Sequence, residues 1–305
     1  MQAVVQRLFA SIGILIGVTF LTFLLSFVVP SDPARTVAGP KADAETLASV
    51  RRELGLDRPL LEQYGKYMTR LLRADFGRSY LTRQSVFAAI VDRLPATAYL
   101  ALTSLTVAAG VGISLGCASA AIQGSIFERL LLSSTLVGLS LPAFWVGLML
   151  LYVFAYRLRL LPLGGYGGVN VILPAIALAL GNAAYYARLV HTNVREVLQL
   201  DYIRTARAKG VAPMALYTRH ALRNALLPVV TLLGLDLAGL MSGVVLTETV
   251  FNWPGLGRLA VEAVFNQDIP MVMGTVLFSA LLIVAANIVV DLLYLVIDPR
   301  IRVES

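Results

Sequence analysis

Residues Asp201 to Pro228 have the sequence DYIRTARAKGVAPMALYTRHALRNALLP, which is polar, basic and rich in helix-forming residues. Two long apolar segments flank it. A basic segment in that setting is typical of a loop that a membrane-embedded protein holds in water. A second unusual stretch, Glu248 to Arg258 (ETVFNWPGLGR), precedes the last apolar segment. The two stretches predict a membrane protein with an aqueous loop on which another molecule acts.

The composition of the chain indicates lipid as its main solvent. Of the 305 residues, 58% are hydrophobic and only 14% are charged, whereas soluble proteins carry about 25% charged residues. The mean hydropathy is +0.77. The net charge is +7, but the basic residues are not interleaved with aromatic ones as in surfaces that stack nucleic-acid bases. We therefore expect no nucleic-acid partner.

The reactive residue types are scarce. Cys117 is the only cysteine, so neither an intramolecular disulfide nor a cysteine metal cluster can form. The two histidines are His191 and His220, and we expect both in the polar loop, over residues 191–225. We expect no metal site and no catalytic residue in this chain.

Six segments are apolar and long enough to cross a membrane, which takes about 20 residues. The first, Leu8–Val29, has no charge and is longer than the core of a signal peptide, about 7–15 residues, so we expect it to be retained. The others are Ala96–Ile122, Leu130–Tyr156, Leu160–Ala187, Leu226–Thr247 and Ile269–Val290. Four glycines within residues 164–168 favour a loop, so the fourth helix should begin near Ile172. The predicted fold is an all-α polytopic membrane protein with six transmembrane helices.

The distribution of lysine and arginine predicts the orientation. With the N-terminus in the cytosol, the short inner segments 1–7, 123–129, 191–225 and 298–305 carry ten Lys or Arg residues. The short outer loops 157–168 and 251–268 carry three. Positive charge favours the cytosolic side in short loops, so both termini should be cytoplasmic.

The resulting division is a cytoplasmic N-terminus and first helix (1–29), an extracytoplasmic segment (30–95), a five-helix permease region (96–298) and a cytoplasmic C-terminus (299–305). Helical spacing of apolar residues predicts two helices in the outer segment, Ala44–Gly55 and Leu60–Leu72. Asp92 to Pro95 should turn the chain into the second span.

The polar loop has the pattern of two short helices. Val194 to Lys209 should form the first, with Gly210 as its stop, and Pro213 should open a second that runs toward Asn224. Two interpretations are open: a loop whose charge only fixes topology, and a compact docking element. The helical spacing and the Gly–Pro corner favour docking.

The same loop resembles the cytoplasmic EAA loop of ABC-importer permeases, in the form used by the dipeptide/oligopeptide/nickel permease family. The matching residues are Tyr202, Arg204, Thr205, Ala206, Arg207, Ala208, Lys209 and Gly210, then His220, Arg223, Asn224, Ala225 and Pro228. Arg204-Thr205-Ala206 stands where the general motif has Glu-Ala-Ala, so no acidic contact can be assigned there.

Segments elsewhere in the chain are similar to the same family, and to the first of its two permeases. They are 7–8, 30–34 (with Ser31 where Gly is usual), 54–60, 75–79, 93–97, 253–258 and 298–302.

This resemblance implies the transmembrane subunit of an ATP-driven importer in the bacterial inner membrane. Its implied partners are a second homologous permease, two ABC ATPase subunits and an extracytoplasmic solute-binding protein, which docks on the 30–95 segment and the 251–271 loop. The chain has no G-x-x-x-x-G-K-[ST] phosphate loop, so ATP and Mg are expected on the ATPases. The residues implied in ATPase coupling are Asp201, Tyr202, Arg204, Thr205, Ala206, Lys209 and Gly210.

Polar groups in the apolar segments are candidates for the translocation pathway, because charge inside a membrane usually faces protein or water. These are Asp236, Asn182, Glu248 and Asn287. Each also has a packing interpretation, a hydrogen bond between helices. For Pro142 and Pro174 we expect helix bending.

Di- or oligopeptides are the expected cargo, with nickel chelates, other metals or glycosides as alternatives. Gly164-Gly165-Tyr166-Gly167-Gly168 has a slight similarity to nickel-type members. A secondary transporter would show repeats and more intramembrane ionisable groups. An intramembrane enzyme would need a catalytic pair at membrane depth.

Overall fold

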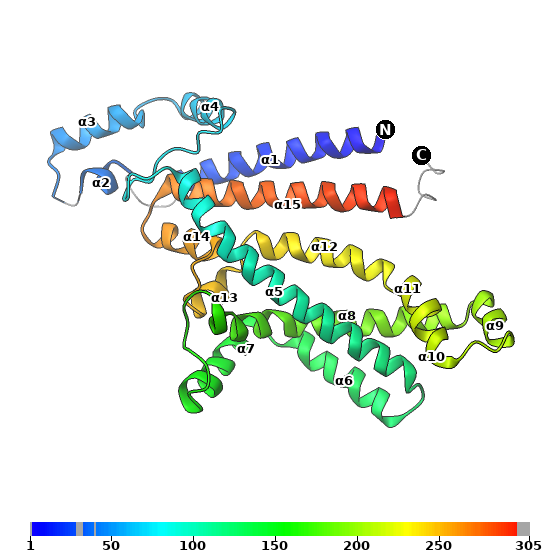
Figure 1. The fold of residues 1–305 in the computed structure, drawn as a ribbon. Coiled ribbons are helices and arrows are strands. Elements are labelled where there is room, and N and C mark those ends of the chain that lie inside the picture. Colours follow the sequence, from blue (N-terminus) through cyan, green and yellow to red (C-terminus); the bar gives the residue numbers. More distant parts are fainter. Residues whose placement is uncertain (1, 29–32, 40, 298–305) are drawn as a thin grey trace.

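The computed structural model describes residues 2–28, 33–39 and 41–297. These residues form helices joined by turns (Figure 1), and the part described contains no β-strand beyond one isolated bridge between Arg78 and Ser85. The predicted all-helical class is confirmed.

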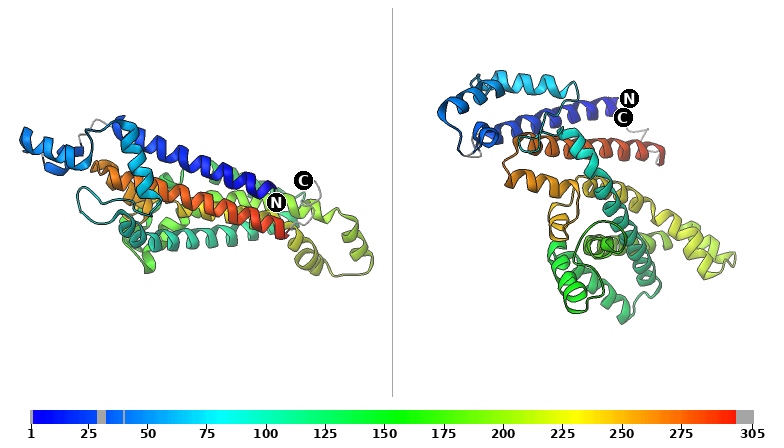
Figure 2. Two further views of the ribbon diagram at one scale, coloured as in Figure 1. Left: turned by 90° about the horizontal axis from the view of Figure 1, so that it is seen from above. Right: turned by 60° about the vertical axis from the view of Figure 1, so that its left-hand side comes forward.

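Six helices extend back and forth between the two ends of the bundle, with α5 and α6 inclined to the others (Figure 1). They are α1 (Gln2–Val28), α5 (Val86–Ala121), α6 (Ile126–Ser140), α8 (Ile172–Leu198), α12 (Leu227–Met241) and α15 (Ile269–Ile297). The start of α1 and the end of α15 lie toward the end of the bundle from which α9 (Asp201–Ala208) projects, here called the loop end (Figures 1 and 2). The opposite end is called the cap end.

The core of the bundle is the contact between α5 and α8. Tyr186, Val190 and Val194 of α8 are buried there against small residues of α5. A Cβ atom on Gly112 would lie 2.8 Å from the carbonyl oxygen of Ala183, and one on Gly116 would lie 2.6 Å from that of Ala187. Glycine at these two positions lets the helix backbones approach closely, which is how membrane helices associate when no hydrophobic force drives them together.

By length and composition, three helical stretches among the described residues could cross a membrane: Val86–Ala121, Gly168–Leu198 and Ile269–Val289. Two further pairs of helices are each bent at a short break, and the number rises to five if each pair is taken as one span. The first bent pair is Ile126–Ser140 with Ala143–Arg157, at 97°, and the second is Leu216–Ala225 with Leu227–Met241, at 48°. Helix α1 contains a shorter apolar stretch, Phe9–Leu25.

The third apolar segment is not the single straight span predicted for Leu130–Tyr156. The chain bends sharply at Leu141 and Pro142, and α7 (Ala143–Leu150) continues into the π-helix η1 (Leu151–Arg157) across the cap end. Pro142 therefore bends the chain as predicted, since proline disfavours a helical conformation of the residue before it. Pro174 does not bend its helix, because it lies in the first turn of α8, where a proline displaces no hydrogen bond.

Two other boundaries differ from the predictions. Asp92 to Pro95 is not a turn: α5 runs through it, because Ser85 caps the helix and Val86 and Ile90 are buried against α14 (Leu256–Phe265) and α15. The fifth segment, 226–247, breaks after Met241, and α13 (Val245–Val250) follows. The predicted helix start at Ile172 is confirmed after a short 3₁₀ turn, η2 (Gly168–Val171).

The cap end carries α2 (Pro33–Ala38), α3 (Ala44–Leu54) and α4 (Leu60–Leu71) (Figure 1). The last two confirm the helices predicted for the 30–95 segment. Asp43 caps α3 by accepting a hydrogen bond from the Thr46 backbone N–H at 2.9 Å. Hydrogen bonding from the Thr46 side chain, and then from this N–H, lowers the pKa of the Asp43 carboxyl. Gly55 ends the helix in the left-handed conformation.

Candidate functional site

The 201–225 loop folds as a knob of short helices at the loop end. It consists of α9, α10 (Pro213–Ala215), the π-helix η3 (Leu216–Ala221) and α11 (Leu222–Ala225). The second predicted helix, from Pro213 toward Asn224, is confirmed in this composite form. The first is wrong as a single helix over Val194–Lys209, because the chain breaks at Gln199 and Leu200 between α8 and α9. The break lets α9 leave the axis of α8 (Figure 1).

A small apolar core holds the knob together. Ile203 of α9 is fully buried against Leu216 and Ala221, and Val197 and Leu198 at the end of α8 pack on the same cluster. The hydroxyl of Tyr202 accepts a hydrogen bond from Asn224 Nδ2 at 2.8 Å. The knob is therefore attached to α8 by packing as well as by the chain.

Gly210 closes α9 with a left-handed residue, at φ +77°. Its N–H donates to Arg207 O at 3.0 Å, and the Val211 N–H donates to Ala206 O at 3.2 Å. This is the geometry of a glycine helix stop, as predicted. A Cβ atom at Gly210 would meet nothing within 4 Å, so backbone conformation alone favours glycine here.

The predicted coupling residues lie mostly on the outside of the knob. Asp201 and Arg204 form an exposed ion pair at 3.5 Å, with side-chain exposures of 96% and 74%. Thr205, Lys209 and Gly210 are exposed. Ala206 instead packs on the Ile203 cluster. Sequence reasoning missed Ile203, whose only signal was an apolar residue in a polar helix.

A buried polar cluster joins the α5–α6 turn to α8 near the knob. Nδ1 of His191 lies 2.9 Å from Ser119 Oγ, and its Nε2 lies 3.3 Å from Glu128 Oε1. Arg195 approaches the same oxygen at 3.6 Å, and the other oxygen accepts the Gly124 N–H at 2.5 Å.

The position of His191 corrects the prediction that it belongs to the polar loop, because it lies within α8 and is 6% exposed. Ser119, His191 and Glu128 are types found in nucleophilic triads. Ser119 is only 1% exposed, however, and its hydroxyl also donates to Gly116 O. The cluster therefore serves packing between helices.

A second buried junction lies at the cap end and unites segments that sequence reasoning treated separately. The Trp253 indole N–H donates to Ala96 O at 2.9 Å, and the Leu256 N–H donates to Thr97 Oγ1 at 2.8 Å. Glu248, which is fully buried, accepts from the Thr97 hydroxyl at 2.9 Å and from the Arg258 N–H at 3.0 Å. The 93–97 and 253–258 segments thus form one structural unit.

Glycines leave room for this junction. A Cβ atom on Gly257 would lie 2.7 Å from Val245 Cα, and one on Gly255 would overlap the Glu248 carboxylate. Both carboxylate oxygens of Glu248 accept hydrogen bonds inside this unit, which is the kind of contact that its packing interpretation describes.

The other pathway candidates are dispersed through the bundle. Asp236 of α12 accepts a hydrogen bond from the Tyr186 hydroxyl of α8. Asn182 is half-buried on α8, and Asn287 is exposed on α15. They lie on three different helices, and none of the three lines either of the two cavities at the cap end. Among the described residues, no group of three His, Cys, Asp or Glu side chains is placed to hold a metal ion.

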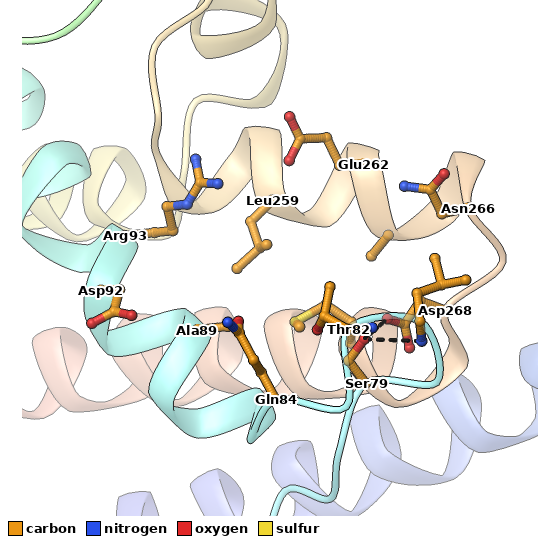
Figure 3. Close-up of a pocket in the computed structure, with 13 residues that line it drawn as sticks. Ser79, Thr82, Gln84, Ala89, Asp92, Arg93, Leu259, Glu262, Asn266 and Asp268 are labelled. Carbon is orange, nitrogen blue, oxygen red and sulfur yellow. Dashed lines mark hydrogen bonds between the residues drawn. The ribbon is translucent and has the colours of Figure 1, made fainter.

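A cavity of about 300 Å³ opens at the cap end between the 79–84 loop, the start of α5 and α14 (Figure 3). Asp268 forms its floor with Ser79, whose hydroxyl donates to the carboxylate, and the Tyr80 N–H adds a bond of 3.0 Å. Asp92 and Arg93 lie at one side of the cavity and Asn266 at the other (Figure 3). Asp268 was not predicted, since nothing in the sequence near it indicates a partner 189 residues away.

Known proteins of similar sequence are membrane components of transport systems. The family model "binding-protein-dependent transport system inner membrane component" matches residues 112–303, and the N-terminal model of such membrane components matches residues 1–101. A putative peptide transport system permease protein of Brucella abortus (strain 2308) is 41% identical over 310 residues, covering 99% of both chains. A glutathione transport system permease protein of Salmonella typhimurium (strain LT2) is 41% identical over 300 residues, covering 98% of both.

Among solved structures, an amino acid ABC transporter crystallised with histidines has a TM-score of 0.53 at 15% identity. The match covers 68% of this chain and 93% of that one. At this identity the likeness concerns the fold alone. With the two sequence comparisons, it shows that the chain is a multi-pass inner-membrane protein and belongs to the peptide-type family of permease components of binding-protein-dependent ABC importers.

Proposed function

We propose that this permease translocates di- or oligopeptides, and that ATP hydrolysis on partner subunits drives it through the 201–225 knob. The names of the relatives support peptides over nickel chelates, since they denote peptide and glutathione transport systems. Family membership disfavours a secondary transporter.

The observation that carries the coupling role is the form of the knob. α9 presents Asp201, Tyr202, Arg204 and Thr205 to the outside, while Ile203 anchors it to the end of α8. A partner that moves α9 would therefore move α8, and α8 packs along α5 through the core of the bundle. This supports two ATPase subunits as the partners at the loop end, holding the ATP and Mg that this chain has no phosphate loop to bind.

We infer a matching arrangement for the rest of the importer. The loop end is cytosolic, with both termini, and the cap end is extracytoplasmic, where the solute-binding protein docks over α3 and the α13–α14 region. A second homologous permease completes the pore, with Asp236, Asn182 and Asn287 as pathway candidates. Nucleotide on the ATPases shifts the pair between inward-open and outward-open states, to the extent that it binds one state more tightly.

The coupling role is tested at Gly210. Gly210→Val should uncouple ATP hydrolysis from uptake in the reconstituted importer, because a β-branched residue is strained at φ +77°. Gly210→Asn is the matched control: asparagine tolerates the left-handed region, so uptake per ATP hydrolysed should stay near the wild-type value. Normal coupling in an inserted Gly210→Val protein would refute the role of the knob.

A further inference from the structure

The α4 helix of the cap has an exposed leucine face. Leu61 is 83% exposed and Leu72, directly after α4, is 85% exposed. Eleven residues separate them, close to three helical turns of 3.6 residues, so both lie on one face. Gly65 and Met68 lie between them on that face. Large apolar side chains so exposed and aligned mark a contact surface.

Helix α4 lies beside the apolar part of α1 rather than beyond its end. Tyr64 packs on Phe20 and Phe23 with ring centroids 5.7 and 5.3 Å apart, and its hydroxyl lies 3.0 Å from Thr19 Oγ1. At 1.5 Å per residue, these contacts lie roughly 8 to 13 Å short of the α1 end at Val28. In Figure 1, α4 is seen nearly along its axis while α1 lies across the page, so the two helices are strongly inclined.

The part of α1 that contacts α4 also has exposed apolar side chains. Phe20 touches Tyr64 yet is 48% exposed, and Leu21 and Leu24 of α1 are exposed as well. Helix α1 packs along α15 at the edge of the bundle (Figures 1 and 2). In a multi-pass membrane protein, an exposed apolar surface at that edge faces lipid.

The opposite face of α4 is basic. Lys66, Arg70 and Arg73 follow one another at spacings of four and three residues, and all three are exposed. Lys66 pairs with Glu62 at 3.6 Å and Arg70 with Asp75 at 3.3 Å, on the exposed surface. A helix with leucines on one face and lysine and arginine on the other is typical of one that lies in the plane of a membrane surface.

We propose that α4 is an interfacial membrane helix, whose Leu61–Leu72 face inserts into the lipid leaflet at the cap end. Lys66, Arg70 and Arg73 then lie at the level of the phospholipid headgroups and water. The occupant of the leucine face is lipid rather than a protein, because α4 packs through Tyr64 on the part of α1 whose exposed apolar residues face lipid. The inference rests on the membrane location of the chain and is independent of its cargo.

Spin-label accessibility tests this placement. In a Cys117→Ser background, a nitroxide is attached to Leu61→Cys or Leu72→Cys, and in matched controls on the basic side of the same segment to Lys66→Cys or Arg73→Cys. The full chain is reconstituted into phospholipid nanodiscs. Labels at 61 and 72 should collide more with oxygen, which concentrates in hydrocarbon, than with a water-soluble nickel chelate. Labels at 66 and 73 should show the reverse order.

Two outcomes would overturn the proposal. Strong collisions with the nickel chelate at 61 and 72 would place the leucines in water, and weak collisions with both reagents would place them against protein. A second measurement covers a label that disturbs the fold: in Leu61→Trp, brominated lipid should quench tryptophan fluorescence beyond the level of the parent protein. No added quenching in that variant would also contradict insertion.

Discussion

At the scale of single residues, close backbone contact determines which side chains are allowed. Gly257, in the first turn of α14, packs directly against the backbone of Val245. Gly210 ends α9 in the left-handed region. The first position excludes a side chain for lack of space, whereas the second disfavours one through backbone conformation. The two glycines therefore respond differently to substitution.

Gly257→Ala should destabilise the protein by about 1–3 kcal/mol, the usual cost of overpacking. The added methyl group would lie 2.7 Å from Val245 Cα and 2.8 Å from Val245 N, which a rotamer change cannot relieve. Thermal unfolding in detergent measures the effect. Gly239→Ala is the control, because a Cβ atom there meets nothing within 4 Å, and it should be neutral or slightly stabilising. Equal unfolding temperatures for the two variants would contradict the close contact.

At the scale of elements, the break at Gln199 and Leu200 makes the knob a separate body fastened by packing. Its core is small, with Ile203, Leu216 and Ala221 as the fully enclosed residues. Loss of one of them should loosen the knob without unfolding the bundle, because the α5–α8 core lies elsewhere.

Ile203→Ala should destabilise the folded knob by about 2–5 kcal/mol, the usual loss of stability when a buried isoleucine is truncated. The loosened knob should then be open to protease. Limited trypsin digestion measures this, because Arg204, Arg207 and Lys209 lie on the exposed side of α9. Met214→Ala, at a side chain that is 75% exposed in the same loop, should be cut at the wild-type rate. If both variants resist trypsin equally, Ile203 does not anchor the knob.

At the scale of the whole molecule, the two ends of the bundle carry different structures. The loop end has the knob and the buried His191–Glu128 cluster, whereas the cap end has α3, α4 and the Glu248 junction. The long helices between them connect the two ends, as the coupling proposed above for the knob requires.

We expect peptide uptake into proteoliposomes to require the complete importer. With the second permease, both ATPases and the binding protein present, labelled di- or tripeptide should accumulate only with hydrolysable ATP. A non-hydrolysable ATP analogue is the control and should give no accumulation. Net peptide flux through this chain alone would contradict the proposed mechanism.

Local patterns in the sequence were enough to predict several features. Hydropathy indicated the apolar helices, and the spacing of leucines located α3 and α4. Gly210 and Pro213 marked the corner of the knob, because left-handed stops and helix starts depend on one or two neighbouring residues.

The long-range features needed the fold. Glu248 meets Thr97 across 151 residues of sequence and His191 meets Ser119 across 72, so neither partner could be inferred from spacing. The extension of α5 through Pro95 had the same cause, since burial of Val86 and Ile90 by α14 and α15 outweighs the local preference for a turn. Hydropathy and helix signals act over a few residues, whereas a buried polar group is stabilised only where the folded chain brings it a partner.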